Sequence, residues 1–361
     1  MTDNYAVIMA GGVGSRFWPM STTSTPKQFL DVLGTGKTLL QLTFDRTVKL
    51  CKKENIYIVT NDEYEAIVST QLPDLPKENI LTEPCRKNTA PCVAYGCYKI
   101  YNKNKNAKIL IAPSDHLIID ENAYIEVINE GFQASENDVL ITLGIKTSRP
   151  DTGYGYIESS DEKLEQFPNF SKVKQFTEKP ELEKAKVFHA DESFYWNSGM
   201  FIWSAESIIK SFKTHSPTLD TIFAAGSDNY NTPSEGDFIL NAYNICDSIS
   251  VDYAIMENAQ NVYVLPCDIG WTDLGTWGAL HGTIPQDENQ NAILGKNIIT
   301  YSATSNMIAN TEDKLVVIQG LQNKIVVNTD KALLICEKEN EQMIKQFVND
   351  LGLNEEYKKL I

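Results

Sequence analysis

A glycine-rich turn followed by two cations is the segment of this sequence best suited to chemistry. Residues 10–16 read Ala-Gly-Gly-Val-Gly-Ser-Arg and follow an apolar run directly. Small residues let the backbone approach a ligand closely and point N–H groups at phosphate oxygens. Arg16 and Lys27 add positive charge, which suits a triphosphate, although a plain strand-to-helix turn is the alternative. The residues expected to contact a nucleotide here are Gly11, Gly12, Gly14 and Ser15.

Two other glycine patterns are poor candidates for a phosphate loop. Residues 34–38, Gly-Thr-Gly-Lys-Thr, look like the end of a Walker A motif, but Asp31 stands where its first glycine belongs. A carboxylate there would repel a phosphate. Residues 12–17 lack the third glycine of a dinucleotide fingerprint, because Phe17 occupies that position. We therefore interpret 34–38 as a turn into a helix, and an NAD site is disfavoured.

Two aspartates in turns are candidate metal ligands. Asp115 lies in Pro-Ser-Asp-His, just after an apolar run at 107–112, and Asp273 lies in Gly-Trp-Thr-Asp. Mg²⁺ prefers hard oxygen ligands and usually takes one or two protein carboxylates together with phosphates and water. Either aspartate could instead be a turn or helix-cap residue.

The elements that must position these residues alternate between strand and helix in the first part of the chain. Buried strands are predicted at 5–10, 56–60, 107–112 and 139–143, and helices at 39–52 and 90–102. This alternation predicts an α/β fold with a doubly wound, mostly parallel mixed sheet and helices on both faces. Ligands of such sheets bind beyond the carboxyl ends of the strands, which is where the glycine turn and Asp115 fall.

The remainder of the chain predicts a change of architecture. Strands are expected at 154–158, 173–177 and 200–203, with helices at 180–189, 205–214 and 251–258. Short strands separated by Asn, Asp and Gly turns follow at 297–301, 314–319, 324–328 and 332–337, before a last helix at 339–351. We expect a catalytic domain at 1–288 and a small β-rich C-terminal domain with a terminal helix at 289–361.

Bulk properties limit the partners. The 361 residues carry a formal net charge of −16, which disfavours nucleic acid and anionic membranes. No apolar stretch is long enough to span a bilayer, and the N-terminus has no basic segment typical of a signal peptide. The seven cysteines are scattered without a Cys-x-x-Cys pair, which favours reduced thiols. We expect a cytoplasmic protein.

Together, several blocks resemble the signature of mannose-1-phosphate guanylyltransferases. The resemblance covers about residues 5–280 in the order of that family. The blocks are Gly-Gly-Val-Gly-Ser-Arg-Phe-Trp-Pro at 11–19, Pro-Lys-Gln-Phe-Leu at 26–30, Glu-Pro at 83–84, Asn-Thr-Ala-Pro at 88–91, Pro-Ser-Asp-His at 113–116, Gly-Tyr-Gly-Tyr-Ile at 153–157, Phe-Thr-Glu-Lys-Pro at 176–180, Asn-Ser-Gly-Met at 197–200 and Gly-Trp-Thr-Asp-Leu-Gly-Thr-Trp at 270–277.

The resemblance implies the Rossmann-like fold of nucleotide-diphospho-sugar transferases and transfer of GMP from GTP to α-D-mannose 1-phosphate. The sugar phosphate would attack the α-phosphorus in line and expel pyrophosphate, without an enzyme nucleophile. Mg²⁺ would lie between Asp115 and Asp273. Arg16 and Lys27 would hold the triphosphate, so that these four residues carry catalysis. A nucleotidyltransferase with another NTP or hexose 1-phosphate, or a silent regulatory subunit, stays open.

The resemblance also implies the substrate contacts. Glu83 and Asn88 fall in the base-binding region. Glu178 would accept hydrogen bonds from sugar hydroxyls and Lys179 would hold the sugar phosphate, although Glu-Lys before proline could be a surface turn. Asn197 and Gly155 would complete the sugar pocket. Related bifunctional enzymes carry an isomerase domain for which this chain is too short, so we expect no isomerase activity. We also expect a homodimer.

Overall fold

The computed structural model describes residues 3–12 and 14–361, so Val13 of the glycine turn lies outside the described residues. The chain forms two compact units. The first consists of Met1–Gly11, Thr43–Ser114 and Ile118–Trp271. The second consists of Gly12–Leu42, Asp115–Leu117 and Thr272–Ile361. Each unit is therefore assembled from segments that are distant in the sequence.

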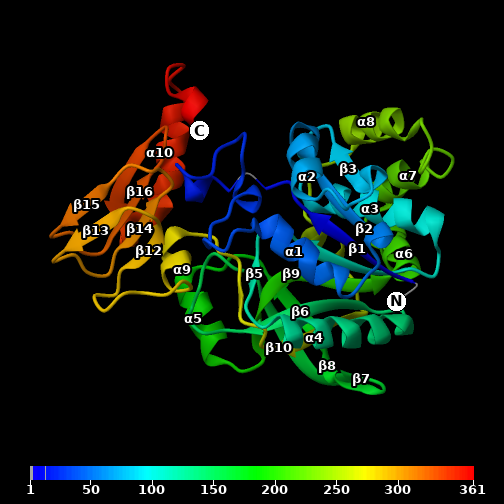
Figure 1. The fold of residues 1–361 in the computed structure, drawn as a ribbon. Coiled ribbons are helices and arrows are strands. Elements are labelled where there is room, and N and C mark those ends of the chain that lie inside the picture. Colours follow the sequence, from blue (N-terminus) through cyan, green and yellow to red (C-terminus); the bar gives the residue numbers. More distant parts are fainter. Residues whose placement is uncertain (1–2, 13) are drawn as a thin grey trace. The chain divides into compact units, whose positions relative to one another are not determined.

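The first unit is built on one large sheet, whose strands lie in the order β3-β2-β1-β4-β9-β6-β10-β8-β7 (Figure 1). The pairs β3–β2, β2–β1, β1–β4 and β6–β10 are parallel, whereas β9 pairs antiparallel to β4 and β6. The predicted strands are confirmed within two residues at most ends. The bounds are β1 (Asn4–Met9), β2 (Ile56–Asn61), β3 (Ile80–Glu83), β4 (Lys108–Pro113), β6 (Leu140–Lys146), β7 (Tyr156–Leu164), β8 (Phe167–Thr177), β9 (Phe194–Ser204) and β10 (Val262–Cys267).

Helices cover both faces of this sheet. Val7 is aligned with Ile111 and Ile111 with Phe201, so these side chains share one face, while Ile202 points to the other. On α3 (Thr89–Lys103), a Cβ on Gly96 would lie 2.8 Å from Val7 Cγ2. On α4 (Glu121–Ala134), a Cβ on Gly131 would lie 2.3 Å from Ile202 Cδ1. The doubly wound α/β class is therefore confirmed.

The predicted helices are found, three of them with differences. The helix predicted at 339–351 opens with a 3₁₀ helix, η8 (Lys338–Met343), and becomes α-helical at Ile344. The helix predicted at 39–52 ends at Val48, and the one predicted at 251–258 is a π-helix, η7 (Asp252–Met256), in which the Glu257 amide donates to Asp252 O at 2.9 Å. Such a turn has one residue more than an α-turn. The bounds are α1 (Leu39–Val48), α2 (Glu65–Gln71), α3 (Thr89–Lys103), α4 (Glu121–Ala134), α5 (Leu182–Ala190), α6 (Ala205–His215), α7 (Pro217–Ala224) and α8 (Glu235–Ile245).

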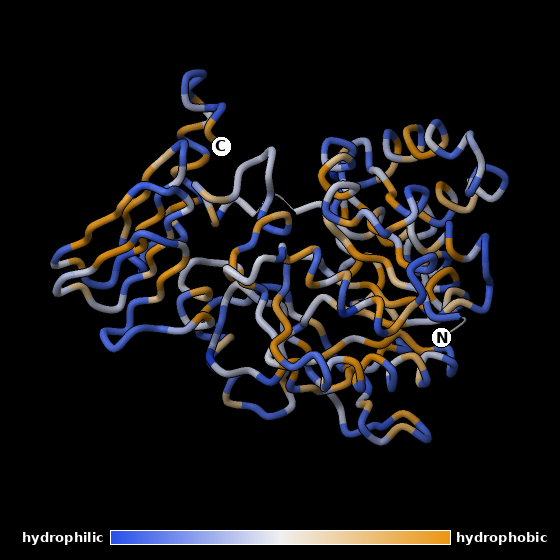
Figure 2. Tube along the Cα trace, in the orientation of Figure 1, coloured by the Kyte–Doolittle hydropathy of each residue, from blue (hydrophilic) through white to orange (hydrophobic). Residues whose placement is uncertain are grey.

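The apolar residues concentrate where the strands lie. In Figure 2 the strands of the first unit are mostly orange and the loops around them mostly blue. Strand β1 has five buried residues in succession, as expected for a parallel strand covered on both faces. The uninterrupted burial of β1 and β2 agrees with strands in the interior of the sheet, covered by helices on both faces.

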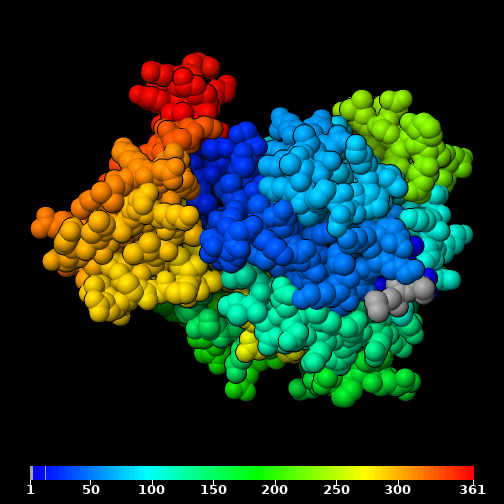
Figure 3. All heavy atoms as spheres, in the orientation of Figure 1, coloured from blue at the N-terminus to red at the C-terminus, as the bar shows by residue number. Residues whose placement is uncertain are grey.

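The second unit contains short, stacked strands. Strand β14 pairs in parallel with β12 and β16, β17 pairs antiparallel with β16, and β13 pairs in parallel with β15. Figure 3 shows the residues after about 290, from yellow to red, gathered in one continuous body. The bounds are β12 (Ala292–Gly295), β13 (Ile298–Tyr301), β14 (Met307–Asn310), β15 (Val316–Gln319), β16 (Lys324–Asn328), β17 (Leu333–Glu337), α9 (Trp277–His281) and α10 (Ile344–Gly352), with the two-residue strands β5 (Leu117–Ile118) and β11 (Trp271–Thr272) at the junctions.

Buried asparagines join successive turns of this β structure. The Asn306 side chain donates to Asn291 Oδ1 at 2.9 Å, and Asn328 donates to Asn310 Oδ1 at 2.8 Å. Asn310 in turn donates to the main-chain oxygen of Lys296 at 2.8 Å. Each amide thereby satisfies polar groups that would otherwise be buried without a partner.

One apolar core of the second unit connects its N-terminal and C-terminal segments. Phe17 and Trp18, beside the glycine turn, share it with Trp277, with Ile344 of α10 and with strand residues such as Met307. The Trp18 indole also donates to Leu360 O at 2.9 Å. The predicted β-rich C-terminal region is thus confirmed, while a boundary at 288/289 stays a prediction. Within the described residues, no helix is both long and apolar enough to cross a membrane.

Candidate active site

The ammonium group of Lys27 joins the two aspartate turns of the second unit. Its Nζ lies 3.0 Å from Asp115 Oδ2 and donates to the main-chain oxygens of Asp273 at 2.8 Å and Leu274 at 3.1 Å. These acceptors match the three protons of an ammonium group. The Lys27 side chain is only 4% exposed, so its charge is paired where water is largely excluded. Three of the four predicted catalytic residues are therefore brought together.

Asp115 follows the end of β4 by two residues and keeps a partly open carboxylate. Burial raises its pKa, but the positive charge of Lys27 and the neighbouring His116 outweigh burial, and the net pKa lies below the ordinary value. The His116 Nε2 atom lies 3.8 Å from Asp115 Oδ1. With 35% of the side chain exposed, Asp115 offers an ionised oxygen ligand that solvent can reach.

The Asp273 turn is held in one shape by its neighbours. Asp273 Oδ1 accepts a hydrogen bond from the Gly275 amide at 2.8 Å. A Cβ at Gly275 would lie 2.5 Å from Asp273 Oδ2, so a larger residue would displace the carboxylate. Leu274 has φ 44°, which is uncommon for a residue with a side chain. The turn thus fixes the direction of a second carboxylate.

The glycine turn is shaped around Lys27. Gly14 has φ 63°, and a Cβ there would lie 2.8 Å from Lys27 Cβ. The Gln28 side chain donates to Gly12 O at 2.8 Å. Ser15 then opens a short 3₁₀ helix (Ser15–Phe17) that carries Arg16. Among the described residues, none forms a hydrogen bond or ion pair with the Arg16 side chain, so its donors remain available to a ligand.

Glu83 is a buried carboxylate of the first unit, at the end of the edge strand β3. Its Oε1 accepts from the Tyr243 hydroxyl at 2.8 Å, and its Oε2 lies 3.4 Å from where a Cβ on Gly11 would stand. Burial raises its pKa to about 7, against the opposing hydrogen bond from Tyr243 and charge of Arg86. The structure therefore places a carboxylate with an unusually high pKa next to the first glycine of the turn.

Asn88 has a different local role. It stands at the N-terminus of α3 with φ 68°, and its side chain accepts from the Thr89 amide at 2.8 Å. Thr89 Oγ1 accepts from the Val251 amide at 2.9 Å. Asn88 therefore shapes the start of α3, and its contact with a nucleotide stays a prediction.

Gly155, Glu178 and Asn197 are brought together in the first unit. A Cβ at Gly155 would lie 2.5 Å from Glu178 Oε2 and 3.7 Å from Asn197 Nδ2. The main-chain N–H of Asn197 also donates to Gly155 O at 2.8 Å. Both side chains approach so closely that only glycine fits at position 155. The acceptor Glu178 Oε2 and the donor Asn197 Nδ2 therefore lie near the same point beside Gly155.

Lys179 stands beside this group in an uncommon conformation. It has φ 43° immediately before Pro180, and its ammonium group contacts Glu178 Oε1. Its side chain is 60% exposed. A residue held in a sparsely populated conformation next to a candidate binding residue is typical of functional sites.

Two further residues of the first unit belong to these groups and were not found from the sequence. Tyr243 hydrogen-bonds Glu83, and Asp252 accepts from Asn197 Nδ2 at 2.8 Å. Each is separated from its partner by at least 55 positions. Asp252 gave one weak signal, an acidic residue within the otherwise apolar run 251–256.

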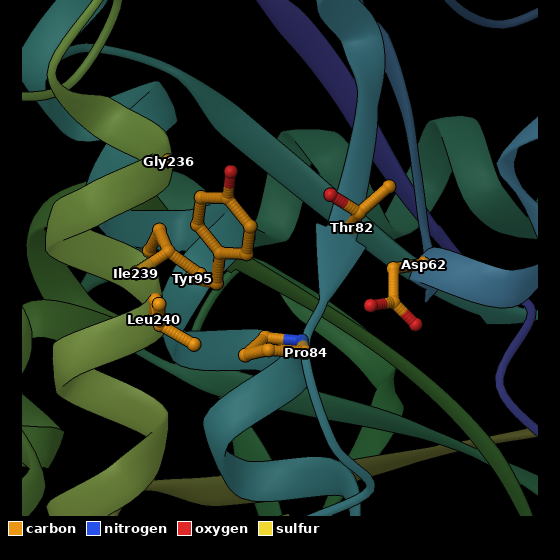
Figure 4. Close-up of a pocket in the computed structure, with 7 residues that line it drawn as sticks. All are labelled: Asp62, Thr82, Pro84, Tyr95, Gly236, Ile239 and Leu240. Atoms are coloured by element: carbon orange, nitrogen blue, oxygen red, sulfur yellow. The ribbon is translucent and has the colours of Figure 1, made fainter.

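A hollow at the edge of the sheet is lined by none of the predicted site residues. Thr82 and Pro84 of its wall flank Glu83, but Glu83 itself does not line it (Figure 4). Among the described residues that line it, Asp62 alone is charged. This hollow offers no set of groups that would bind a phosphate, and we assign it no part in the site.

The comparison with known families defines the class of this protein. The profile of the family described as nucleotidyl transferase matches residues 5–290, so the chain belongs to the nucleotidyl transferase family. A second profile, described as MannoseP isomerase/GMP-like beta-helix domain, matches residues 300–351. The chain is thus an enzyme of nucleotidyltransferase type with a β-helical C-terminal segment.

Individual relatives give a finer comparison. A mannose-1-phosphate guanylyltransferase of Klebsiella pneumoniae is 35% identical over 98% of this chain and 75% of its own length. The alginate biosynthesis protein AlgA of Pseudomonas syringae is 36% identical over 96% of this chain and 71% of its own. The resemblance to mannose-1-phosphate guanylyltransferases is confirmed, and the chain acts as a sugar-phosphate nucleotidyltransferase.

Solved structures agree with the fold. A structure described as mannose-1-phosphate geranyltransferase from Thermus thermophilus has a TM-score of 0.86 at 27% identity, covering 97% of this chain and 99% of that one. One described as mannose-6-phosphate isomerase from Helicobacter pylori has a TM-score of 0.60 at 25% identity, covering 75% and 99%.

Proposed function

We propose that this protein transfers GMP from GTP to α-D-mannose 1-phosphate, giving GDP-mannose and pyrophosphate. The observation that carries the proposal is the Lys27 ammonium group, which links Asp115 to the main chain of the Asp273 turn. A cation between two carboxylate-bearing turns suits an enzyme that must hold a polyphosphate and its counter-ion. The names of the relatives support the choice of GTP and mannose 1-phosphate.

The carboxylates of Asp115 and Asp273 fit Mg²⁺. Both offer hard oxygen atoms, Asp115 is held ionised and partly exposed, and the Gly275 contact orients Asp273. One or two carboxylates with phosphates and water are the usual ligands of this ion. When bound, Mg²⁺ would neutralise charge that gathers on the α-phosphate.

The reaction needs positioning and charge more than proton transfer. An anionic phosphate oxygen of mannose 1-phosphate forms a bond to the α-phosphorus while the bond from that phosphorus to the bridging oxygen breaks, and pyrophosphate carries away the electron pair. No proton has to move. Arg16 would bind the triphosphate through its guanidinium group, and Lys27 would add positive charge beside it.

Substrate selection would rest on residues of the first unit. Glu83, when ionised, is an acceptor suited to the N1–H and N2–H donors of guanine, and Gly11 leaves room beside it. Glu178 and Asn197 would bind sugar hydroxyls, and Lys179 the sugar phosphate. A sugar with the wrong epimer would leave Glu178 Oε2 without its hydroxyl partner, which penalises that sugar.

The test is pyrophosphate release by purified protein with Mg²⁺, crossing four NTPs with mannose 1-phosphate and glucose 1-phosphate. Release limited to GTP with mannose 1-phosphate is the expected result. Release with another pair would replace the proposed specificity and keep the reaction class. No pyrophosphate release in any combination would favour a regulatory subunit. Localisation in the cytoplasm and assembly as a homodimer stay predictions, the latter open to light scattering.

A further inference from the structure

Asp252 is a buried acidic residue that the proposed reaction does not use directly. It begins the π-helix η7, and its Oδ1 accepts a hydrogen bond from Asn197 Nδ2 at 2.8 Å. Burial raises the pKa of Asp252, which shows that its carboxylate is held at some cost. Single π-turns are frequent at functional sites. The contact therefore invites a functional interpretation.

The bond fixes which way the Asn197 amide faces. Asp252 Oδ1 accepts this hydrogen bond, so the carboxylate faces the NH₂ group of Asn197. The Asn197 Oδ1 atom faces donors on its other side, the Gly199 amide at 3.1 Å and the Thr142 hydroxyl at 3.4 Å. Three partners thus agree on one orientation, and the second Nδ2 proton is left for a ligand.

Glu178 lies on the side of Gly155 that Asn197 also approaches. The Glu178 Oε2 and Asn197 Nδ2 atoms are 2.5 and 3.7 Å from the same point, the place of a Cβ on Gly155. A sugar hydroxyl can accept from an amide N–H and donate to a carboxylate at once. If the amide were reversed, an oxygen would face the hydroxyl beside the carboxylate, and the donor would be lost.

We propose that Asp252 is a positioning residue of the sugar site, which selects the mannose epimer by holding the Asn197 amide as a donor next to Glu178. This inference rests on the proposed function. It assigns to Asp252 no contact with the substrate. Replacing Asp252 should act through Asn197, and it should change the binding of the sugar phosphate but not of the nucleotide.

The kinetic test compares Asp252→Ala, Asp252→Asn, Asn197→Ala and the double variant Asp252→Ala/Asn197→Ala. Asp252→Ala should raise KM for mannose 1-phosphate about 10-fold, the worth of one good hydrogen bond, and leave KM for GTP unchanged. In Asp252→Ala, the ratio of kcat/KM for mannose 1-phosphate to that for glucose 1-phosphate should fall. Asp252→Asn keeps an acceptor and should stay within about 3-fold of wild type. The double variant should equal Asn197→Ala, because residues that act through one another are not additive.

Glu257→Gln is the matched control. Burial raises the pKa of Glu257 most, and the nearby charges of Asp252 and Glu178 raise it further. The substitution therefore removes a neighbouring charge but leaves the hydrogen bond from Asn197 to Asp252 in place. Equal effects of Glu257→Gln and Asp252→Ala, additivity in the double variant, or a parallel loss for GTP would overturn the proposal. If Asp252→Ala does not fold, Asp252→Ser replaces it in the cycle.

A measurement without turnover separates this inference from the proposed function. In ¹⁵N-labelled protein without substrates, the Asn197 side-chain amide protons should exchange slowly in wild type and faster in Asp252→Ala. Fast exchange in wild type would overturn the positioning role. Slow exchange together with no pyrophosphate release from GTP and mannose 1-phosphate would uphold the bond and overturn only the proposed function.

Discussion

Tyr243 donates its hydroxyl hydrogen to Glu83 across 160 positions of sequence, with the two oxygens 2.8 Å apart. The contact joins the C-terminal part of α8 to the end of the edge strand β3. Burial nevertheless keeps the pKa of Glu83 near 7, so its charge changes within the physiological range. The proposed guanine acceptor is therefore also a titrating group of the folded protein.

Glu83 should make the protein less stable as pH rises from about 4.5 to about 7. Its pKa is raised on folding, so the folded state binds the proton more tightly, and that stabilisation is lost as pH passes through the folded pKa. In Glu83→Gln this loss should be absent. The change in the free energy of unfolding between pH 4.5 and 7 should therefore differ by about 3 kcal/mol between wild type and variant. Urea unfolding at several pH values measures it. Tyr243→Phe, which removes an opposing hydrogen bond, should move the midpoint upward, and parallel curves for wild type and Glu83→Gln would contradict the assignment.

Lys27→Met should reduce both turnover and stability. It leaves the Asp115 carboxylate and two carbonyl groups without their shared donor, which costs on the order of 1–3 kcal/mol of unfolding free energy. Turnover should fall by about 10²-fold, as for loss of one preorganised cation. Thermal unfolding and pyrophosphate release measure the two effects. Lys49→Met, which breaks an exposed pair with Glu121, is the control and should change neither.

Asp115→Asn and Asp273→Asn should each retain the fold and lose about 10²-fold or more in turnover. The substituted amides keep the size of the carboxylates but bind a hard cation poorly. Circular dichroism checks the fold, and rates are followed as Mg²⁺ is raised. Near-normal rates in saturating Mg²⁺ would refute the metal assignment.

Lys179→Ala should weaken mannose 1-phosphate far more than GTP. Removing a cation that contacts a phosphate costs about 1.5–3 kcal/mol, or roughly 10- to 100-fold in KM for that substrate. Separate titration of each substrate gives the two KM values. Equal effects on both would contradict the placement of Lys179 at the sugar phosphate. Lys184→Ala, which replaces an exposed lysine of α5, provides the comparison.

The sequence pattern predicts the strands that lead to the site, but it does not predict the contacts that hold the site residues in place. The buried runs at 5–10 and 107–112 predict β1 and β4 because both faces are covered. The sequence does not predict β12 and β14, although it predicts β13 and β15, which also have four residues each, so strand length alone does not explain the difference.

Long-range contacts explain what the sequence missed. The bond of Asp252 to Asn197 spans 55 positions, and that of Lys27 to the Asp273 carbonyl spans 246. Pattern describes neighbours along the chain, so it points to Lys27 without its partners, and the family resemblance likewise names Asn197 without Asp252. The π-turn at Asp252 is likewise invisible, because its apolar spacing predicts an ordinary helix.

The shared core of the second unit bears on where this protein can be shortened. Phe17 and Trp18, next to Arg16, are buried against Trp277 and α10, and the Trp18 indole is bonded to Leu360. Truncation near residue 290 would strip the apolar cover from the segment that carries the glycine turn. Even removal of the last few residues would break the Trp18 bond. The C-terminal strands are thus scaffolding for the proposed nucleotide loop, and a minimal enzyme cannot be made by trimming this chain from its end.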